Sequence, residues 1–219
     1  MFAEQIKEIA QQIEQFQSDG LRLFSTSSFQ TNSVVLLDII SKIDKSIPIY
    51  MINTGFLFPE TLLFRDQLQS LLGLHIQEVY SQTPKIHQMS TQGRLLFATD
   101  PDLCCHLNKV APLEPIIAEA DVWINGIRAS QSDTRKAMQK IQPTKRVLRY
   151  HPLLDWTSAM VYQYIEHYKL PKHPLEDEGY ISIGCRPCTR KWVDDLDDRG
   201  GRWAGLHKTE CGLHTTLGS

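Results

Sequence analysis

The chain has 219 residues, of which 42% are hydrophobic and 22% charged, with 12 Gly and 11 Pro. This composition excludes collagen-like, low-complexity and intrinsically disordered proteins. Its 23 basic and 25 acidic side chains leave a net charge of −2, so no overall field attracts the chain to nucleic acid or to an anionic membrane, and any anion site must be local.

The predicted elements alternate between helices and strands along most of the chain. Near the N-terminus, Ile6, Ile9, Ile13 and Phe16 recur at helical spacing and predict an amphipathic helix. The expected helices lie at 3–19, 33–44, 60–72, 113–120 and 156–168, and the expected strands at 21–24, 47–52, 75–80, 122–125 and 147–150. This alternation predicts an α/β fold with a mainly parallel sheet flanked by helices.

Three polar loops follow predicted strands, at Ser25–Asn32, Asn53–Phe58 and Gly126–Arg135. In parallel sheets, ligands bind where loops leave the carboxyl ends of the strands. The first loop is rich in hydroxyls and precedes a helix, so it could hold an anion or simply cap that helix. It lacks the Lys-Ser/Thr ending of a nucleoside-triphosphate P-loop, which disfavours ATP cleavage by that mechanism.

Four of the five cysteines form two close pairs, Cys104-Cys105 and the Cys-x-x-Cys of Cys185 and Cys188. Four thiolates can ligate a tetrahedral zinc ion or an iron–sulfur cluster. Adjacent cysteines point in different directions, so they reach a bulky cluster more easily than a single ion. A redox Cys-x-x-Cys with two structural cysteines is the alternative. The odd count suits a reducing compartment, and apolar runs are far below the roughly 20 residues that span a bilayer, so we expect a cytoplasmic protein.

The fifth cysteine, Cys211, lies eight residues before the end of the chain. Chain termini are usually mobile, so a packed structural role is not expected there, and Cys211 is the candidate nucleophile. His207, Lys208 and His214 could raise its thiolate fraction. The alternative is an idle surface thiol.

Basic residues gather in the same regions of the sequence. Lys109 follows the cysteine pair, Arg128 and Arg135 lie in the third polar loop, and Arg199 and Arg202 flank a Gly-Gly pair. Any one of them could be a solvated loop charge. As a set they indicate recognition of phosphate or sulfate.

Several short motifs are spread in order over nearly the whole chain. They are Ser27-Ser28-Phe29, Asn53-Thr54-Gly55, Phe58-Pro59-Glu60-Thr61, Cys104-Cys105 with Lys109, Gly126-Ile127-Arg128, His151-Pro152-Leu153, Ile183-Gly184-Cys185-Arg186-Pro187-Cys188 and Glu210-Cys211-Gly212-Leu213-His214. In this order they resemble the assimilatory sulfonucleotide reductases, which act on adenylyl sulfate (APS) or phosphoadenylyl sulfate (PAPS). The resemblance implies a Rossmann-like fold of the adenine nucleotide alpha hydrolase type. It further implies a sulfonucleotide-binding domain over 1–190 that carries the iron–sulfur ligands, and a mobile C-terminal tail over 191–219.

The reaction that this resemblance implies turns a sulfonucleotide into sulfite and AMP, in assimilatory sulfate reduction and cysteine biosynthesis. Cys211 would attack the substrate's sulfur as a thiolate and leave an enzyme S-sulfocysteine. Thioredoxin or glutaredoxin thiols would then release sulfite. Because the chain ends eight residues after Cys211, we expect this reductant to be a separate protein. Family members commonly form dimers or tetramers, so a homo-oligomer is compatible with the resemblance.

The resemblance also assigns the remaining site residues. Lys109, Arg199 and Arg202 match positions near the phosphosulfate, and Arg128, Ser27 and Ser28 would hold the nucleotide. The resemblance implies a [4Fe-4S] cluster, which is expected to aid the reaction electrostatically. The residues that match its four ligands are Cys104, Cys105, Cys185 and Cys188.

Substrate choice is the point on which the motifs diverge. The four cluster cysteines are typical of APS reductases, whereas the loop Thr26-Ser27-Ser28-Phe29 resembles that of the PAPS branch, so dual use stays open. From a different class, a zinc-stabilised non-catalytic nucleotide-binding module is the alternative. An ATP-pyrophosphatase-like enzyme is disfavoured, because Ser25–Ser33 lacks a Ser-Gly-Gly-x-Asp-Ser type loop.

Overall fold

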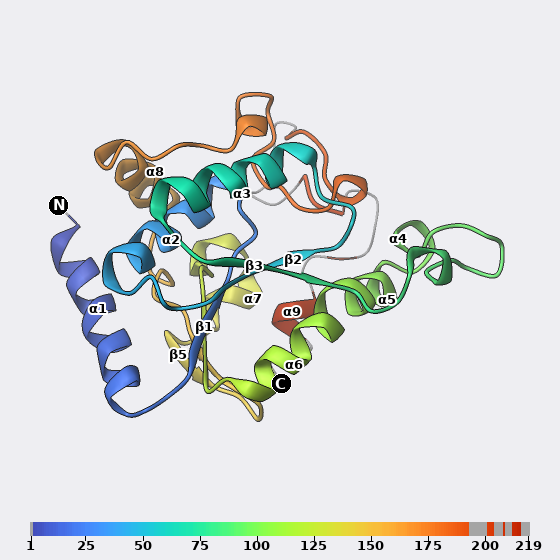
Figure 1. Ribbon diagram of the computed structural model, residues 1–219. Helices are drawn as coiled ribbons and strands as arrows, with labels where there is room; N and C mark the ends of the chain where they lie inside the picture. The colour runs from blue at the N-terminus through green and yellow to red at the C-terminus, as the bar shows by residue number, and fades with distance from the viewer. Residues whose placement is uncertain (1, 193–200, 204–207, 209–211, 216–219) are drawn as a thin grey trace.

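The computed structural model describes residues 2–192, 201–203, 208 and 212–215. In this part of the chain one sheet has the strand order β3-β2-β1-β4-β6-β5, and only β5 runs antiparallel to its neighbour (Figure 1). The strands are β1 (Leu23–Thr26), β2 (Ile49–Asn53), β3 (Ile76–Tyr80), β4 (Val122–Asn125), β5 (Ile141–Pro143) and β6 (Leu148–Tyr150).

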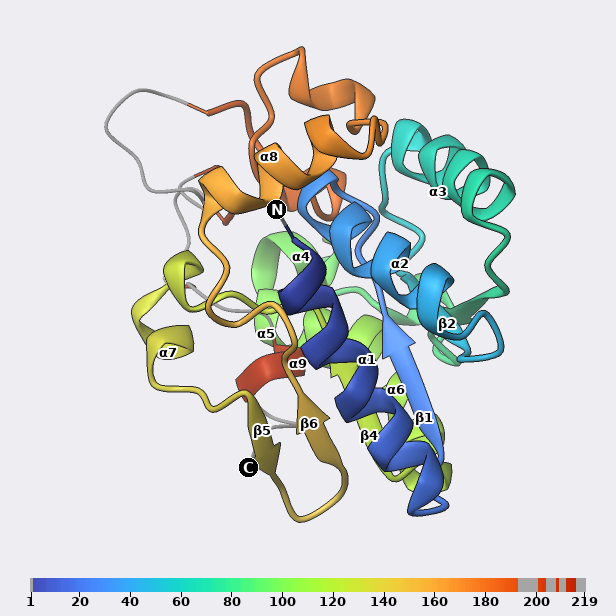
Figure 2. The ribbon, with the colours of Figure 1, turned by 90° about the vertical axis from the view of Figure 1, so that its left-hand side faces the viewer.

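Helices cover both faces of the sheet (Figures 1 and 2). The α-helices are α1 (Ala3–Ser18), α2 (Thr31–Ile43), α3 (Pro59–Leu72), α4 (Leu96–Thr99), α5 (Pro101–Cys105), α6 (Ala111–Glu119), α7 (Asp133–Lys136), α8 (Ser158–His167) and α9 (Gly212–Thr215). Short 3₁₀ turns are η1 (Lys85–His87), η3 (Ala129–Gln131), η4 (Pro174–Glu176) and η5 (Arg186–Cys188), and η2 (His106–Val110) is a π-helical turn between α5 and α6.

The two faces of the sheet carry separate apolar cores. Val122 and Ile124 of β4 pack with α1, α2, α3 and α8, whereas Trp123 between them packs with α6. Successive side chains of a strand point to opposite faces, so a strand that is covered on both faces is apolar throughout. All four residues of β4 are buried, which explains why its sequence shows no apolar–polar alternation.

The sequence predicts the α/β class and the mainly parallel sheet correctly, and the predicted elements end within two residues of the observed ones. The largest displacement among the strands is β1, expected at 21–24 but found at Leu23–Thr26. Ser25 and Thr26 were assigned to a loop because they are polar. Both pair with β2 and β4, and Trp123 Nε1 donates to Thr26 Oγ1 at 2.9 Å, so the sheet accommodates their hydroxyls.

Two further differences have simple physical causes. Strand β5 was not predicted, because a short edge strand that ends in Pro143 has no periodic apolar pattern. Helix α8 begins two residues later than expected because Thr157 caps it, its Oγ1 accepting the Met160 N–H at 3.2 Å. In the part of the chain that the structure describes, every helix falls short of the length and hydropathy that crossing a bilayer takes.

Helix α3 offers a matched test of this packing. Leu68 is fully buried against the core and Leu63 of the same helix is 68% exposed. Leu68→Ala should lower the free energy of unfolding by about 2–5 kcal/mol, because it leaves a cavity, whereas Leu63→Ala should change it by less than about 1 kcal/mol. Urea unfolding measures both, and equal effects would contradict the assigned face of α3.

Candidate active site

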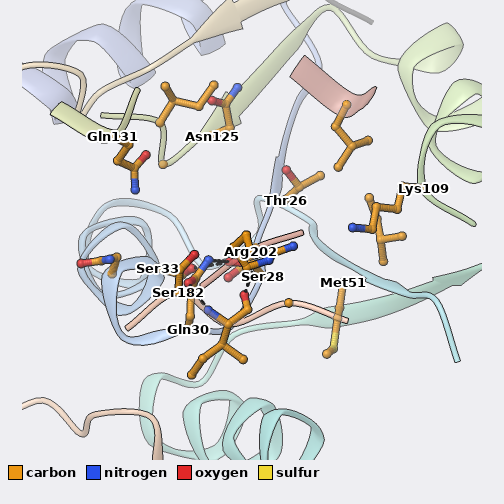
Figure 3. A pocket seen from close by; sticks show the side chains of 18 of the residues that line it. Thr26, Ser28, Gln30, Ser33, Met51, Lys109, Asn125, Gln131, Ser182 and Arg202 are labelled. Carbon is orange, nitrogen blue, oxygen red and sulfur yellow. Dashed lines mark hydrogen bonds between the residues drawn. The ribbon is translucent and has the colours of Figure 1, made fainter. Parts of the chain in front are cut away.

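A cavity of ≈ 210 Å³ opens at the carboxyl edge of the parallel strands. Its walls come from the three predicted loops after β1, β2 and β4, together with residues 181–185 and 202–203 (Figure 3). In Figure 3, Lys109 and Gln131 lie on opposite sides of this space and Arg202 lies between them. The three polar loops at the carboxyl edge of the sheet therefore line one cavity, and that it holds a ligand stays a prediction.

The hydroxyl-rich loop lies at the N-terminal end of α2. Phe29 has a φ of 53°, an uncommon value for a residue with a side chain, and its buried ring holds the loop in place. Its N–H donates to Ser27 Oγ at 3.1 Å, and the Ser28 and Ser33 hydroxyls lie 3.0 Å apart. Ser27 and Ser28 both line the cavity, next to the positive end of the α2 dipole.

The described lining of this cavity includes four cations and no carboxylate. The cations are Lys109, Arg128, Arg135 and Arg202. Such a concentration of one charge attracts anions although the whole chain has a net charge of −2. The structure therefore brings together the predicted basic residues, except Arg199, which lies outside the described residues.

Arg128 and Arg135 are held by one glutamine that the sequence analysis did not single out. Gln131 Oε1 accepts a hydrogen bond from the Arg128 backbone N–H at 3.1 Å. The same oxygen accepts a second hydrogen bond from the Arg135 guanidinium. The Arg128 guanidinium donates to Ser158 Oγ at 3.1 Å. Both arginines are buried, so their orientation is fixed before a ligand arrives.

Arg202 depends on a glycine for its position. Its Nη1 donates to the Ile183 carbonyl at 3.3 Å, and its guanidinium lies 4.6 Å from the Trp203 ring centroid. A Cβ on Gly184 would lie 2.3 Å from Arg202 Nη2, far inside van der Waals contact. Position 184 must therefore be glycine for Arg202 to lie against this backbone.

A buried polar pair fixes another wall of the cavity. His151 Nδ1 lies 2.5 Å from Oδ1 of Asn125, a cavity residue, and the histidine is fully buried. Burial, and then the charges of Arg149 and Arg135, lower the pKa of His151 to about 3. The ring is thus neutral, and its Nδ1–H donates to Asn125 Oδ1, which can only accept. In the sequence, only the motif His151-Pro152-Leu153 points to this histidine, and it does not name Asn125 as the partner.

A second, smaller cavity adjoins the first. Thr54, Phe56, Asn108 and Lys109 contribute to its wall, and all four of the paired cysteines line it: Cys104, Cys105, Cys185 and Cys188. Cys104 and Cys105 close helix α5, and Cys185 and Cys188 bracket the turn η5. The two cysteine pairs, about 80 residues apart in the chain, therefore lie at one place.

The loop after β2 contacts the Cys-x-x-Cys segment through its backbone. The Arg186 N–H donates to the Phe56 carbonyl at 2.7 Å, and Leu57 forms a β-bridge with Cys185. Thr54 Oγ1 lies 3.2 Å from the Cys185 sulfur. Thr54 belongs to the motif Asn53-Thr54-Gly55, but nothing in that motif predicts its contact with a cysteine.

The donor set of this cavity fits a group that binds through several thiolates. Burial raises the pKa of the Cys104 and Cys188 thiols, and the neighbouring thiols raise it further, so ionising all four requires a cationic group among them. Among the described residues, no three His, Cys, Asp or Glu side chains converge closely enough to hold one metal ion. The four cysteines nevertheless line one cavity, and four thiolates are the ligands of a tetrahedral zinc ion or an iron–sulfur cluster.

Three residues belong to the walls of both cavities: Thr54, Lys109 and Cys185. The cationic cavity and the four-thiol cavity are therefore neighbours with a common wall. An anion bound in the first would lie across that wall from Cys104, Cys105 and Cys188, which line only the second cavity.

The predicted nucleophile, Cys211, lies outside the described residues. The nearest described residues on either side of it in the sequence are Lys208 and Gly212, the latter followed by Leu213. Lys208 contacts the Asp102 carboxylate at the start of α5, and Leu213 lines the cationic cavity. The expected boundary between a domain over 1–190 and a mobile tail also falls where much of the chain is not described.

Comparisons with known proteins give a consistent result. Residues 22–191 match the family model described as the phosphoadenosine phosphosulfate reductase domain. The chain is 38% identical over 212 residues to an adenosine 5′-phosphosulfate reductase from Chelativorans sp. (strain BNC1), and this alignment covers 97% of this chain and 85% of that protein. It is 39% identical over 200 residues to a phosphoadenosine 5′-phosphosulfate reductase from Gloeobacter violaceus, covering 89% and 83%.

A solved structure agrees with these sequence relatives. The phosphoadenylyl-sulfate (PAPS) reductase from Candida auris, a phosphate complex, superimposes with a TM-score of 0.67 at 26% identity. The match covers 83% of this chain and 90% of that one.

The buried His151 gives the folded protein a pH dependence. The unfolded chain protonates this histidine below its ordinary pKa of 6.5, whereas the folded chain does so only near pH 3, so stability falls with pH between these values. From pH 6.5 to 5 the native protein should lose about 2 kcal/mol more than His151→Asn, which keeps a donor for Asn125. Urea unfolding at both pH values measures this difference.

The exposed His75 supplies the control. His75→Asn should follow the pH dependence of the native protein. Parallel curves for the native protein and His151→Asn would contradict a neutral, buried His151.

Proposed function

Since the chain belongs to the phosphoadenosine phosphosulfate reductase domain family, we propose that it reduces adenylyl sulfate to sulfite and AMP. The observation that carries the proposal is the common wall of the cationic cavity and the four-thiol cavity, formed by Thr54, Lys109 and Cys185. An anionic nucleotide and a thiol-ligated group would then lie side by side.

The cationic cavity offers both surfaces that a sulfonucleotide needs. Leu36, Met51 and Ile127 supply apolar wall for the adenine, and the Ser27 and Ser28 hydroxyls lie beside them. Arg128, positioned by Gln131, would hold the nucleotide. Arg202 and Lys109 would face the phosphosulfate, together with Arg199.

Cys211 would carry the chemical step. Its thiolate attacks the substrate's sulfur, a sulfur–sulfur bond forms, and the bond from sulfur to the bridging phosphate oxygen breaks, so that its electron pair leaves with AMP. Both reactants are negatively charged, so cations that neutralise the phosphosulfate lower the barrier. The positions of Lys208 and Leu213 support this role for Cys211.

A dithiol of thioredoxin or glutaredoxin would complete the cycle. One of its thiolates attacks the Cys211 sulfur, a mixed disulfide forms, and sulfite leaves with the electron pair of the former sulfur–sulfur bond. The second thiol then attacks the reductant's sulfur in the mixed disulfide, which closes a disulfide in the reductant and releases the Cys211 thiolate. The two electrons that reduce the sulfur thus come from the external protein. Such a partner and exposed thiol chemistry suit a cytoplasmic location.

The four paired cysteines would hold a [4Fe-4S] cluster. The observation that supports this assignment is that all four thiols line one cavity, and a zinc-stabilised nucleotide-binding module is the alternative. When bound, the cluster would supply an electrostatic influence on the neighbouring substrate.

For the substrate, we favour APS over PAPS because the chain has all four cluster cysteines. The relatives include proteins of both names, and the Ser27-Ser28 loop keeps dual use as the alternative. Purified enzyme supplied with thioredoxin and each nucleotide in turn should release sulfite faster from APS. Equal or faster release from PAPS would reverse the assignment.

The covalent intermediate gives the most direct test of the reaction. Incubated with APS and no reductant, the enzyme should gain a sulfonate on the Cys211 peptide, detected by mass spectrometry. Cys211→Ser should lose turnover by a factor of at least about 10³ while its iron content is unchanged, because the nucleophile is removed and the cluster ligands are kept. A sulfonate on another residue would contradict the mechanism.

The role of Arg202 can be tested through Gly184. Gly184→Ala should raise KM for APS by about 10-fold, because the new methyl group displaces the guanidinium and a hydrogen bond to a charged group contributes about 1.5–3 kcal/mol. Arg202→Ala should have a similar effect. The double variant should be no worse than Arg202→Ala alone, and iron analysis checks that Cys185 still binds. Additive effects would show that Gly184 acts on something other than Arg202.

A further inference from the structure

A second lysine lies beside the four-thiol cavity and away from the cationic cavity. Lys85, in η1, is half-buried, and its ammonium lies 4.5 Å from the Phe56 ring centroid. Its Cε lies 3.0 Å from the position that a Cβ on Gly55 would occupy. Lys85 is thus packed against the loop after β2, which contacts the Cys-x-x-Cys segment through its backbone.

The Lys85 ammonium contacts the side-chain oxygen of Asn108, which is buried in the wall of the thiol cavity. The same oxygen accepts from Gln88 Nε2 at 3.2 Å. A lysine can only donate, so it faces the oxygen of the Asn108 amide and fixes which end of that amide points where.

The other end of the Asn108 amide faces a cysteine. Its Nδ2 donates to Gln88 Oε1 at 2.6 Å and to the Cys104 carbonyl at 2.9 Å, and lies 3.7 Å from the Cys104 sulfur. Asn108 follows Cys104 by four residues and lies in the π-helical turn η2. Its amide therefore points back along the helix toward the Cys104 carbonyl and sulfur. Were the amide reversed, its oxygen would face the sulfur and repel a thiolate.

We infer that Lys85 is a positioning residue for the four-thiol site, orienting Asn108 so that an N–H faces the Cys104 sulfur. N–H···S hydrogen bonds and nearby charge are two means by which a protein stabilises and tunes a thiolate-bound cluster. The inference rests on the proposed [4Fe-4S] cluster.

The experiment measures how fast the anaerobically prepared, iron-loaded enzyme loses iron to a chelator, followed by its visible absorption. Lys85→Met should release iron about 10-fold faster, because outer-shell partners of metal ligands contribute about 10–100-fold to affinity. Lys85→Arg, which keeps the charge and the donors, should restore the native rate. Lys45→Met, at an exposed lysine, is the control and should behave as the native protein.

A double-mutant cycle separates this role from simple packing. Asn108→Leu should speed iron loss as much as Lys85→Met, and the double variant should be no faster than either, because Lys85 acts through Asn108. If Lys85→Met does not fold, as judged by circular dichroism, Lys85→Ala takes its place with the same expected rate, because it too removes the donor.

The possible failures are distinguishable. A native rate of iron loss in Lys85→Met, or additive effects with Asn108→Leu, would overturn the role of Lys85 alone. A native enzyme that binds no iron after anaerobic reconstitution would overturn both the cluster and this inference.

Discussion

The parallel pairing of β1 with both β2 and β4 is the constraint on which the two cavities depend. In this register Thr26, the last residue of β1, lies opposite Asn125, the last residue of β4, and β2 continues three residues past Tyr50 to Asn53, so the three loops leave the same edge of the sheet. The loop after β2 then supplies Thr54 to both cavities and holds the Cys-x-x-Cys segment through backbone contacts. A shift of one residue in any strand would turn these side chains to the opposite face.

Charge is distributed so that the cations of the site do not depend on the overall charge of the chain. Arg128 and Arg135 are buried, and their guanidinium groups are oriented by Ser158 and Gln131 respectively. The neighbouring His151 stays neutral, so it adds no further positive charge. Burial keeps water away from these groups and strengthens their attraction for an anion. Because Lys109 belongs to both walls, one cation would act on the nucleotide and on the thiol-bound group together.

Much of the fold and part of the site could be predicted from the sequence, because apolar runs, turn residues and cysteine spacing are local signals. The sheet class, the three carboxyl-edge loops and the basic residues near them follow from such patterns. The contacts of Lys85 with Asn108 and of His151 with Asn125 could not be predicted, because they join segments about 23 and 26 residues apart with no periodic pattern. The sequence places Ser25 and Thr26 in a loop because hydroxyl residues are typical of loops, whereas both pair within the parallel sheet and Ser25 is buried there. The predictions for Cys211 and Arg199 concern residues that are not described.

A crystal structure of the enzyme with AMP bound would test most directly whether the two cavities form one active site. The adenine is expected beside Leu36 and Met51, with the phosphate within hydrogen-bond distance of Lys109 or Arg202, Cys185 in the shared wall, and the other three paired cysteines beyond it. AMP bound away from the carboxyl edge of the sheet, or with its phosphate turned away from the cysteine cavity, would contradict that arrangement.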